Sequence, residues 1–269
     1  MADLVRARLI DVSRYNDCTD LSKAVDAWGI VGVMARCTIG WAYVDPFYEH
    51  NFRQARDLGL LFGAYHVLWP WNKDPLREVQ HFKDHMAVRG EPPDFVVDDL
   101  ELPKPSDDAG WKAVSPKEVG QQIAVQVPAI RDRTGLTTLC YTRDTWWNGP
   151  QMAPITPIGI EDDFYLIEAE YTIQKPCGKV SFDKAPAAPR MPTVAGGWTR
   201  ERTIMWQWTS CLAPIPNGPE GAAACDGDVL LVDYDRFLQI IGAAAPPVSD
   251  QVKLQRLWDS HPELHYPGV

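Results

Sequence analysis

The sequence lacks the motifs that mark several large classes of enzyme. It contains neither a phosphate-cradling glycine loop nor a G-x-S-x-G turn, the usual signals of nucleotide-binding and acyl-transfer proteins. Its six cysteines form no C-x-x-C pair, so zinc ribbons and thioredoxin-like redox chemistry are not supported. No apolar run approaches the length of a membrane-spanning helix. We therefore expect a protein that does not insert into a membrane.

Positive charge is also scarce. The chain has 26 Lys and Arg residues against 36 Asp and Glu residues, a net charge of −10, and no run of basic residues stands out. Such a surface repels polyanions, so we expect no nucleic-acid partner, and no obligate protein partner is evident. The start of the chain carries Asp3, Arg6 and Arg8 where a secretory signal needs an uninterrupted apolar stretch. We expect synthesis in the cytoplasm as a soluble protein, with any export by another route.

The length and the apolar content indicate one large domain and a tail. With 269 residues, 45% of them hydrophobic, the chain can bury the core of an α/β barrel. We assign residues 1–242 to this domain and residues 243–269 to a tail, which begins with an Ala/Pro linker and continues in a short amphipathic helix, Val252 to Trp258. The tail is too short to fold alone, and it is free to pack on the barrel, stay mobile or dock a partner.

Short apolar runs alternate with helical patterns along the first half of the chain, which indicates β-α units and a parallel sheet. Strands are predicted at 9–12, 31–38, 61–68, 95–100, 139–141, 165–171, 203–208 and 229–232, and helices at 21–28, 47–58, 75–88 and 115–134. After the fourth helix the segments between strands hold much Pro and Gly and little helical periodicity. We therefore predict an irregular (β/α)5(β)3 barrel of eight strands, with the active site at the C-terminal ends of the strands.

The fourth predicted strand ends in a group of acids, Asp98-Asp99-Leu100-Glu101. Because side chains alternate along a strand, Asp99 and Glu101 share one face, and Asp98 points to the helix layer, where it caps a helix or meets a basic partner. Two carboxyls on one buried face repel each other and lose solvation, which raises the pKa of one of them. A protonated carboxyl beside an ionised one is what the cleavage of a glycosidic bond requires.

Two further acids close predicted strands. Asp11 ends the first strand and Asp233 the last. If all eight strands are parallel, these ends open on the same mouth as Glu101, and the acids converge there. An acidic cluster that merely meets solvent or caps a helix is the alternative interpretation.

Aromatic residues gather at the same predicted strand ends. Flat apolar rings beside hydrogen-bonding carboxylates suit sugar rings, although a single Trp is more often a packing residue. The aromatic residues at or just after strand ends are Trp41, Tyr43, Trp69, Trp71, Trp146, Trp147 and Trp208.

Histidine and cysteine give weaker indications. His66 ends the third strand, where it either binds substrate or is a structural histidine. His81 and His85 are four residues apart on a helix but lack a third ligand, so we expect no metal site. Cys211 and Cys225 bracket a loop and are either bridged or free.

In combination, these residues resemble glycoside hydrolase family 25, lysozymes that cut peptidoglycan between N-acetylmuramic acid and N-acetylglucosamine. The resemblance covers roughly residues 9–237. It is carried by Asp11-Val12-Ser13-Arg14-Tyr15-Asn16, Arg36-Cys37-Thr38, Asp45-Pro46-Phe47-Tyr48, Gly63-Ala64-Tyr65-His66, Asp99-Leu100-Glu101, Trp206-Gln207-Trp208-Thr209 and Val232-Asp233.

The resemblance implies a role for each acid. Glu101 would be the general acid, Asp99 would orient the reacting sugar and stabilise positive charge, and Asp11 and Asp233 would complete the pocket. Tyr65 and Trp208 would be subsite residues, and His66, Trp69 and Tyr141 are further candidates for binding the substrate. Such enzymes use no cofactor. Leu9, Ile39 and the missing tryptophan of the sixth strand depart from the family pattern and put the subsite preference in doubt.

Two other functions remain open at this stage: a non-catalytic carbohydrate-binding barrel, and a barrel glycosidase acting on another polysaccharide such as chitin. Retention of Glu101, Asp99 and Asp11 argues against the first, because binding alone needs no proton donor. A wall hydrolase without a secretory signal resembles a phage lysin or a virion component, an inference by analogy.

Overall fold

The computed structural model describes residues 6–16, 20–101, 114–149, 152, 156–172, 180–212 and 225–243. Its strands are β1 (Arg8–Val12), β2 (Ile30–Ile39), β3 (Tyr43–Val44), β4 (Leu61–Val67), β5 (Phe95–Asp99), β6 (Thr138–Thr142), β7 (Tyr165–Ala169), β8 (Thr203–Thr209) and β9 (Asp226–Leu230). Its helices are α1 (Leu21–Trp28), α2 (Tyr48–Asp57), α3 (Pro75–Met86), α4 (Pro116–Thr134), α5 (Asp144–Trp147) and α6 (Tyr234–Ile241).

The sheet closes into a barrel of eight strands. Its order is β1-β9-β8-β7-β6-β5-β4-β2, and β1 pairs with β2 to complete the circle, while β3 adds a short antiparallel edge to β2. Apart from the β3 edge, the pairings that join β1, β2, β4, β5, β6, β7 and β8 are parallel. Strand β9 runs antiparallel to both β8 and β1. The predicted irregular α/β barrel is confirmed. The assumption that its last strand runs parallel to the others is wrong.

Local capping explains where the longer helices begin and end. Ser115 and Glu118 form a capping box at the start of α4, and Gly135 ends this helix in a left-handed conformation. Asp20 and Asp74 accept hydrogen bonds from backbone N–H groups at the starts of α1 and α3. These helices lie close to the predicted ranges because capping and apolar periodicity agree there.

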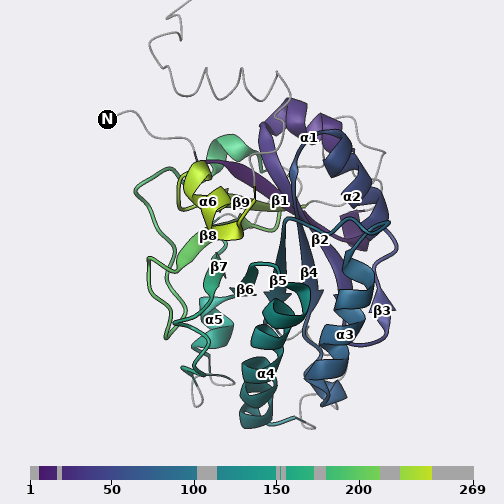
Figure 1. The fold of residues 1–269 in the computed structure, drawn as a ribbon. Coiled ribbons are helices and arrows are strands. Elements are labelled where there is room, and N and C mark those ends of the chain that lie inside the picture. Colours follow the sequence, from purple (N-terminus) through teal and green to yellow (C-terminus); the bar gives the residue numbers. More distant parts are fainter. Residues whose placement is uncertain are drawn as a thin grey trace, which may run out of the picture.

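The helices are distributed unevenly around the barrel. Figure 1 shows α1 to α4 following one another around one side, whereas connecting loops and the short α5 accompany β6 to β8. One apolar layer lies between these helices and the strands, and a second fills the barrel interior.

Helix α6 closes one end of the barrel. Its Phe237 packs edge to face on Phe95 at the start of β5, with 5.5 Å between the ring centroids, and Leu238 and Ile241 join the same interior cluster. Because Phe95 begins its strand, α6 covers the end of the barrel opposite the C-terminal ends of the parallel strands.

The remaining expectations concern the cysteines, membrane-spanning helices and the C-terminal tail. Cys37 and Cys140 are buried free thiols. Cys225 is also free while Cys211 is disulfide-bonded, so Cys211 and Cys225 do not bridge each other. In the part of the chain that the structure describes, no helix is long and apolar enough to cross a membrane. The linker and helix predicted for the tail lie outside the described residues, apart from the first residues of the linker.

Candidate active site

An open pocket of about 190 Å³ lies at the C-terminal ends of the parallel strands. The parallel strands and the start of the antiparallel β9 contribute to its wall. Four carboxyl groups and four tyrosines are among the residues that line it: Asp11, Asp99, Glu101, Asp226, Tyr15, Tyr65, Tyr141 and Tyr171. Barrel enzymes carry their active sites at this end.

Asp11 lies at the centre of a hydrogen-bond network. It accepts hydrogen bonds from Tyr65 and from Gln207 Nε2, the latter at 2.9 Å. Gln207 Oε1 in turn accepts hydrogen bonds from the hydroxyls of Tyr141 and Tyr171, each at 2.8 Å. Burial raises the pKa of Asp11 to about 7, despite the opposing effect of Tyr65.

Asp99 and Glu101 face the same pocket, as strand alternation predicts. Asp99 Oδ1 accepts a hydrogen bond from the backbone N–H of Glu101 at 3.2 Å, which fixes the turn that ends β5. Burial, and then the nearby carboxyls of Glu101 and Asp11, raise the pKa of Asp99 well above its ordinary value. Asp99 is therefore held close to the other acids at an electrostatic cost.

Glu101 stands beside a cation. Burial raises its pKa, and the guanidinium of Arg143, which forms an ion pair with Glu101 Oε2, opposes that rise. The net direction is upward. A carboxyl in this environment keeps its proton to a higher pH than an exposed glutamate does.

The fourth acid of the pocket is Asp226, and the sequence-based choice of Asp233 is wrong. Because β9 is antiparallel, its first residue, Asp226, reaches the mouth and pairs in register with Asp11. Asp233 follows the other end of β9 and caps α6, where it accepts a hydrogen bond from Arg236 N–H at 2.7 Å. Burial and the neighbouring Asp11 raise the pKa of Asp226.

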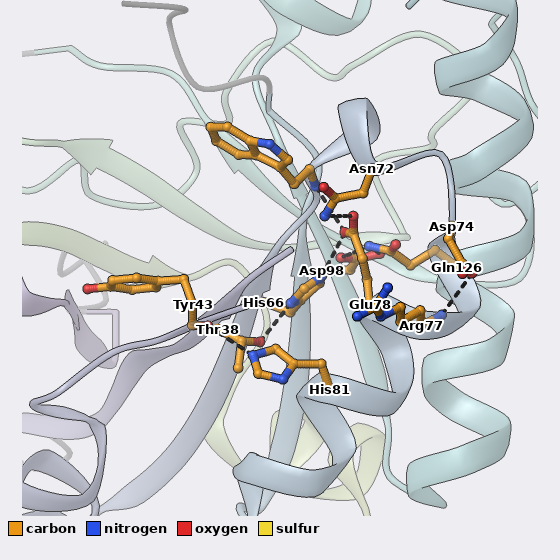
Figure 2. A network of polar contacts seen from close by, with 11 residues as sticks. Thr38, Tyr43, His66, Asn72, Asp74, Arg77, Glu78, His81, Asp98 and Gln126 are labelled. Atoms are coloured by element: carbon orange, nitrogen blue, oxygen red, sulfur yellow. Dashed lines mark hydrogen bonds and ion pairs between the residues drawn. The ribbon is translucent and has the colours of Figure 1, made fainter. Parts of the chain in front are cut away.

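Asp98 points outward, as alternation predicts; His66 acts on it electrostatically, but its hydrogen-bond partner is neither a helix terminus nor a basic residue. Its carboxyl accepts hydrogen bonds from Gln126 Nε2 in the middle of α4, at 3.0 and 3.2 Å (Figure 2). Asp98 is fully buried, and burial raises its pKa to about 7. The expected helix cap is therefore corrected to a side-chain pair between β5 and α4.

His66 also belongs to the outer layer and does not reach the pocket. Its Nδ1 lies 2.7 Å from Thr38 Oγ1, and its Nε2 lies 3.3 Å from Glu78 on α3. The Glu78 carboxylate further accepts hydrogen bonds from Trp69 N–H and Asn72 Nδ2 (Figure 2). Of the two possibilities for His66, the structure supports the structural histidine. The prediction that His66 binds the substrate is corrected accordingly.

Two of the aromatic candidates also lie outside the pocket. Trp208 is fully buried between the barrel and Phe182, with ring centroids 6.0 Å apart. Trp69 packs on Trp71 at 4.8 Å, beyond the residues that line the pocket. Trp208 is on the outward face of β8 and Trp69 lies in the segment after β4, whereas Tyr65 and Tyr141 line the pocket.

Residues 10–213 match the sequence profile of glycosyl hydrolases family 25. The chain belongs to this family. Comparison with curated protein sequences gave no match. The enzyme is therefore a glycoside hydrolase on the evidence of its family, and its carboxyl-lined pocket contains the residue types that this chemistry needs.

Solved structures share the fold of this family 25 enzyme. A lysozyme from Streptomyces coelicolor superposes with a TM-score of 0.66 at 19% identity, over 88% of this chain and 97% of that one. A family 25 lysozyme from Aspergillus fumigatus gives 0.66 at 18%, over 88% and 99%. The catalytic domain of an endolysin from a bacteriophage of Listeria monocytogenes gives 0.59 at 18%, over 88% and 98%.

Sequence reasoning missed several pocket residues of this family 25 enzyme. Gln207 lies between Trp206 and Trp208, and alternation alone sends its side chain inward once the two tryptophans are assigned to the outer layer. Tyr171 and Arg143 follow strand ends by one or two residues, where alternation no longer applies. The described residues contain no group of three His, Cys, Asp or Glu side chains that could hold a metal ion.

Proposed function

We propose that this family 25 enzyme is a muramidase of the lysozyme type, which hydrolyses the β-1,4 bond between N-acetylmuramic acid and N-acetylglucosamine in bacterial peptidoglycan. The observation that carries the proposal is the convergence of Asp11, Asp99, Glu101 and Asp226 in one pocket at the mouth of the barrel. Similar solved structures named lysozyme, muramidase or endolysin support the choice of polymer.

Glu101 is the general acid in this proposal. Its raised pKa lets it keep a proton to a higher pH than an exposed glutamate, and that proton passes to the oxygen of the leaving sugar as the glycosidic bond breaks. The backbone contact with Asp99 fixes the position of Glu101 at the end of β5.

The other three carboxyls stabilise the positive charge that develops on the reacting sugar. Asp99 is nearest along the strand and orients the sugar, while Asp11 and Asp226 complete the acidic wall from β1 and β9. The hydrogen bonds from Tyr65 and Gln207 hold Asp11 in place. Because these acids raise one another's pKa, they share protons, and the carboxyl among them that is ionised stabilises an oxocarbenium-like transition state.

A role in phage-type lysis of the bacterial wall is part of the proposal. It is supported by the structural similarity to the catalytic domain of a phage endolysin. Mass spectrometry of the muropeptides released from several bacterial walls tests it, since it identifies both the bond and the preferred wall.

The deciding experiment compares purified peptidoglycan with chitin, digested side by side. The products are reduced with borohydride and their sugars analysed. We expect reduced muramic acid from peptidoglycan and no soluble product from chitin. Reduced glucosamine from peptidoglycan would make the enzyme a glucosaminidase, and release from chitin alone would favour the other barrel glycosidase.

A further inference from the structure

Arg143 lies beside the pocket, in contact with two residues that line it, and the roles proposed so far do not explain its position. It follows β6 directly and precedes α5, and its guanidinium forms an ion pair with Glu101. The side chains are 36% exposed for Arg143 and 25% for Glu101. The guanidinium carbon also lies 5.8 Å from the ring centroid of Tyr171. Both side chains are therefore partly accessible to solvent, although the Glu101 oxygen of the pair is itself buried.

The guanidinium of Arg143 has donors to spare. One nitrogen engages Glu101, and in the part of the chain that the structure describes its other side-chain nitrogens make no hydrogen bond. Arg36 provides a contrast: its Nε and Nη2 both contact Asp45, at 2.9 and 2.8 Å, and it is largely buried. Arg36 lines the pocket, but its guanidinium is engaged by Asp45, whereas Arg143 presents an unused planar edge of the kind that binds a carboxylate through two hydrogen bonds.

The ion pair opposes the chemistry that Glu101 is proposed to perform. Arg143 lowers the pKa of Glu101 and so favours the ionised form, which has no proton to donate. The other groups that interact electrostatically with Glu101 are acids and phenols, one on its own strand β5 and the rest on or after β1, β6, β7 and β9: Asp99, Asp11, Tyr141, Tyr171 and Asp226. Arg143 is the cation that acts on Glu101, and its charge opposes the rise in pKa that burial imposes.

We propose that Arg143 is a specificity-determining residue, whose unused guanidinium edge binds a carboxylate on the substituent that a muramic residue carries at C3. This deepens the proposed muramidase function and rests on it. A bound carboxylate neutralises Arg143, and the pKa of Glu101 then rises towards the value that burial alone imposes. The general acid is thereby protonated to a higher pH when the charged substrate is bound. The shared chemistry is a carboxylate near C3, from a free lactyl group or from the stem peptide.

The test uses three glycans that differ only in this substituent: alternating N-acetylglucosamine and N-acetylmuramic acid with free lactyl groups, the same glycan as lactyl methyl amides, and the same glycan carrying L-alanyl-D-glutamate. We expect wild-type kcat/KM to favour a charged glycan over the methyl amide by at least about fivefold, the lower end of typical coupling between two sites. The alkaline limb of the kcat profile, which reports the pKa of the general acid in the enzyme–substrate complex, should lie at a higher pH with the charged glycan.

Arg143→Gln should abolish both differences. Its alkaline limb should lie at the same, raised pH with all three glycans, because the cation that depresses the pKa of Glu101 is gone. Arg202→Gln is the matched control, since Arg202 stacks on Tyr165 at the start of β7, far from the mouth, and should retain the preference. Preference for the lactyl form alone, or for the peptide form as well, identifies the source of the carboxylate. An unchanged preference in folded Arg143→Gln would overturn the proposal.

A binding measurement separates this inference from the proposed function. The carboxyl carbon of Glu101 is titrated by ¹³C NMR with N-acetylmuramic acid and with its methyl amide. We expect the acid, and not the amide, to raise the pKa of Glu101 in the wild type, and neither to do so in Arg143→Gln. Equal responses to both ligands, or none, refute the role of Arg143. If only N-acetylmuramic acid raises the pKa of Glu101, but peptidoglycan releases no reduced muramic acid, the role of Arg143 is supported and the muramidase function is refuted.

Discussion

At the scale of single residues, the proposed chemistry depends on a proton held by Glu101. Glu101→Gln keeps the shape of the side chain but removes the transferable proton. We expect turnover to fall by about 10²- to 10⁴-fold, the usual contribution of general acid catalysis, with an unchanged fold. Wall-lysis rates and circular dichroism measure the two quantities. Near-normal turnover in a folded variant would exclude Glu101 as the acid.

The adjacent Asp98 and Asp99 provide a matched pair of substitutions. Asp99→Asn should damage catalysis far more than stability, because Asp99 lines the pocket. Asp98→Asn should leave turnover little changed, since Asp98 faces Gln126 on α4. Lysis rates and melting temperatures of both variants decide the matter. An inactive, stable Asp98→Asn beside an active Asp99→Asn would contradict the observed register.

The residues predicted correctly and incorrectly differ in how they were chosen. Asp99, Glu101 and the outward Asp98 were assigned by alternation within one strand, a geometric rule that holds wherever the strand is regular. His66 and Trp208 were chosen because they stand near strand ends, which says nothing about the face. The same rule places both in the outer layer, next to the inward Tyr65 and Gln207.

At the scale of elements, the direction of β9 was the feature that the sequence did not reveal. Acidic residues stand at both ends of this segment, at Asp226 and Asp233, and apolar alternation is the same whichever way a strand runs. The direction shows only in the pairing with the neighbours, since β9 runs antiparallel to β8 on one side and to β1 on the other. Most other elements were predictable because their capping residues and periodicity are local.

Asp226 and Asp233 should therefore have opposite effects when substituted. Asp226→Asn is expected to lower wall-lysis activity with little loss of stability, because it removes a pocket carboxyl. Asp233→Ala should leave activity intact and lower the free energy of unfolding by about 0.5–2 kcal/mol, the usual loss for an N-cap. Denaturant unfolding and lysis assays on both variants measure this. The reverse pattern would restore Asp233 to the mouth.

At the scale of the whole molecule, the buried carboxyls make stability depend on pH. Burial raises the pKa of Asp11 and of Asp98 to about 7 each, and that of Glu168 to about 8. The folded protein thus binds these protons more tightly than the unfolded chain, whose carboxyls titrate near pH 4. Their stabilising contribution is complete below about pH 4 and declines as pH rises to about 7–8.

We therefore expect the melting temperature to fall between pH 5 and pH 8. Asp98→Asn, which cannot ionise, should reduce this fall, whereas Asp183→Asn at an exposed site should not. Calorimetry of the three proteins at both pH values provides the measurement. A melting temperature that rises over this range would show that the buried acids are ionised and stabilised by partners.

The seal that Phe237 and Phe95 make at the far end of the barrel constrains how a polymer is handled. A glycan cannot pass through the barrel, so it has to lie across the open end with one glycosidic bond next to Glu101. The enzyme does not need to bind an end of the glycan chain before it cuts. Such an enzyme can cut in the middle of a cross-linked mesh, and its early products should be fragments of many lengths rather than a ladder shortened from one terminus.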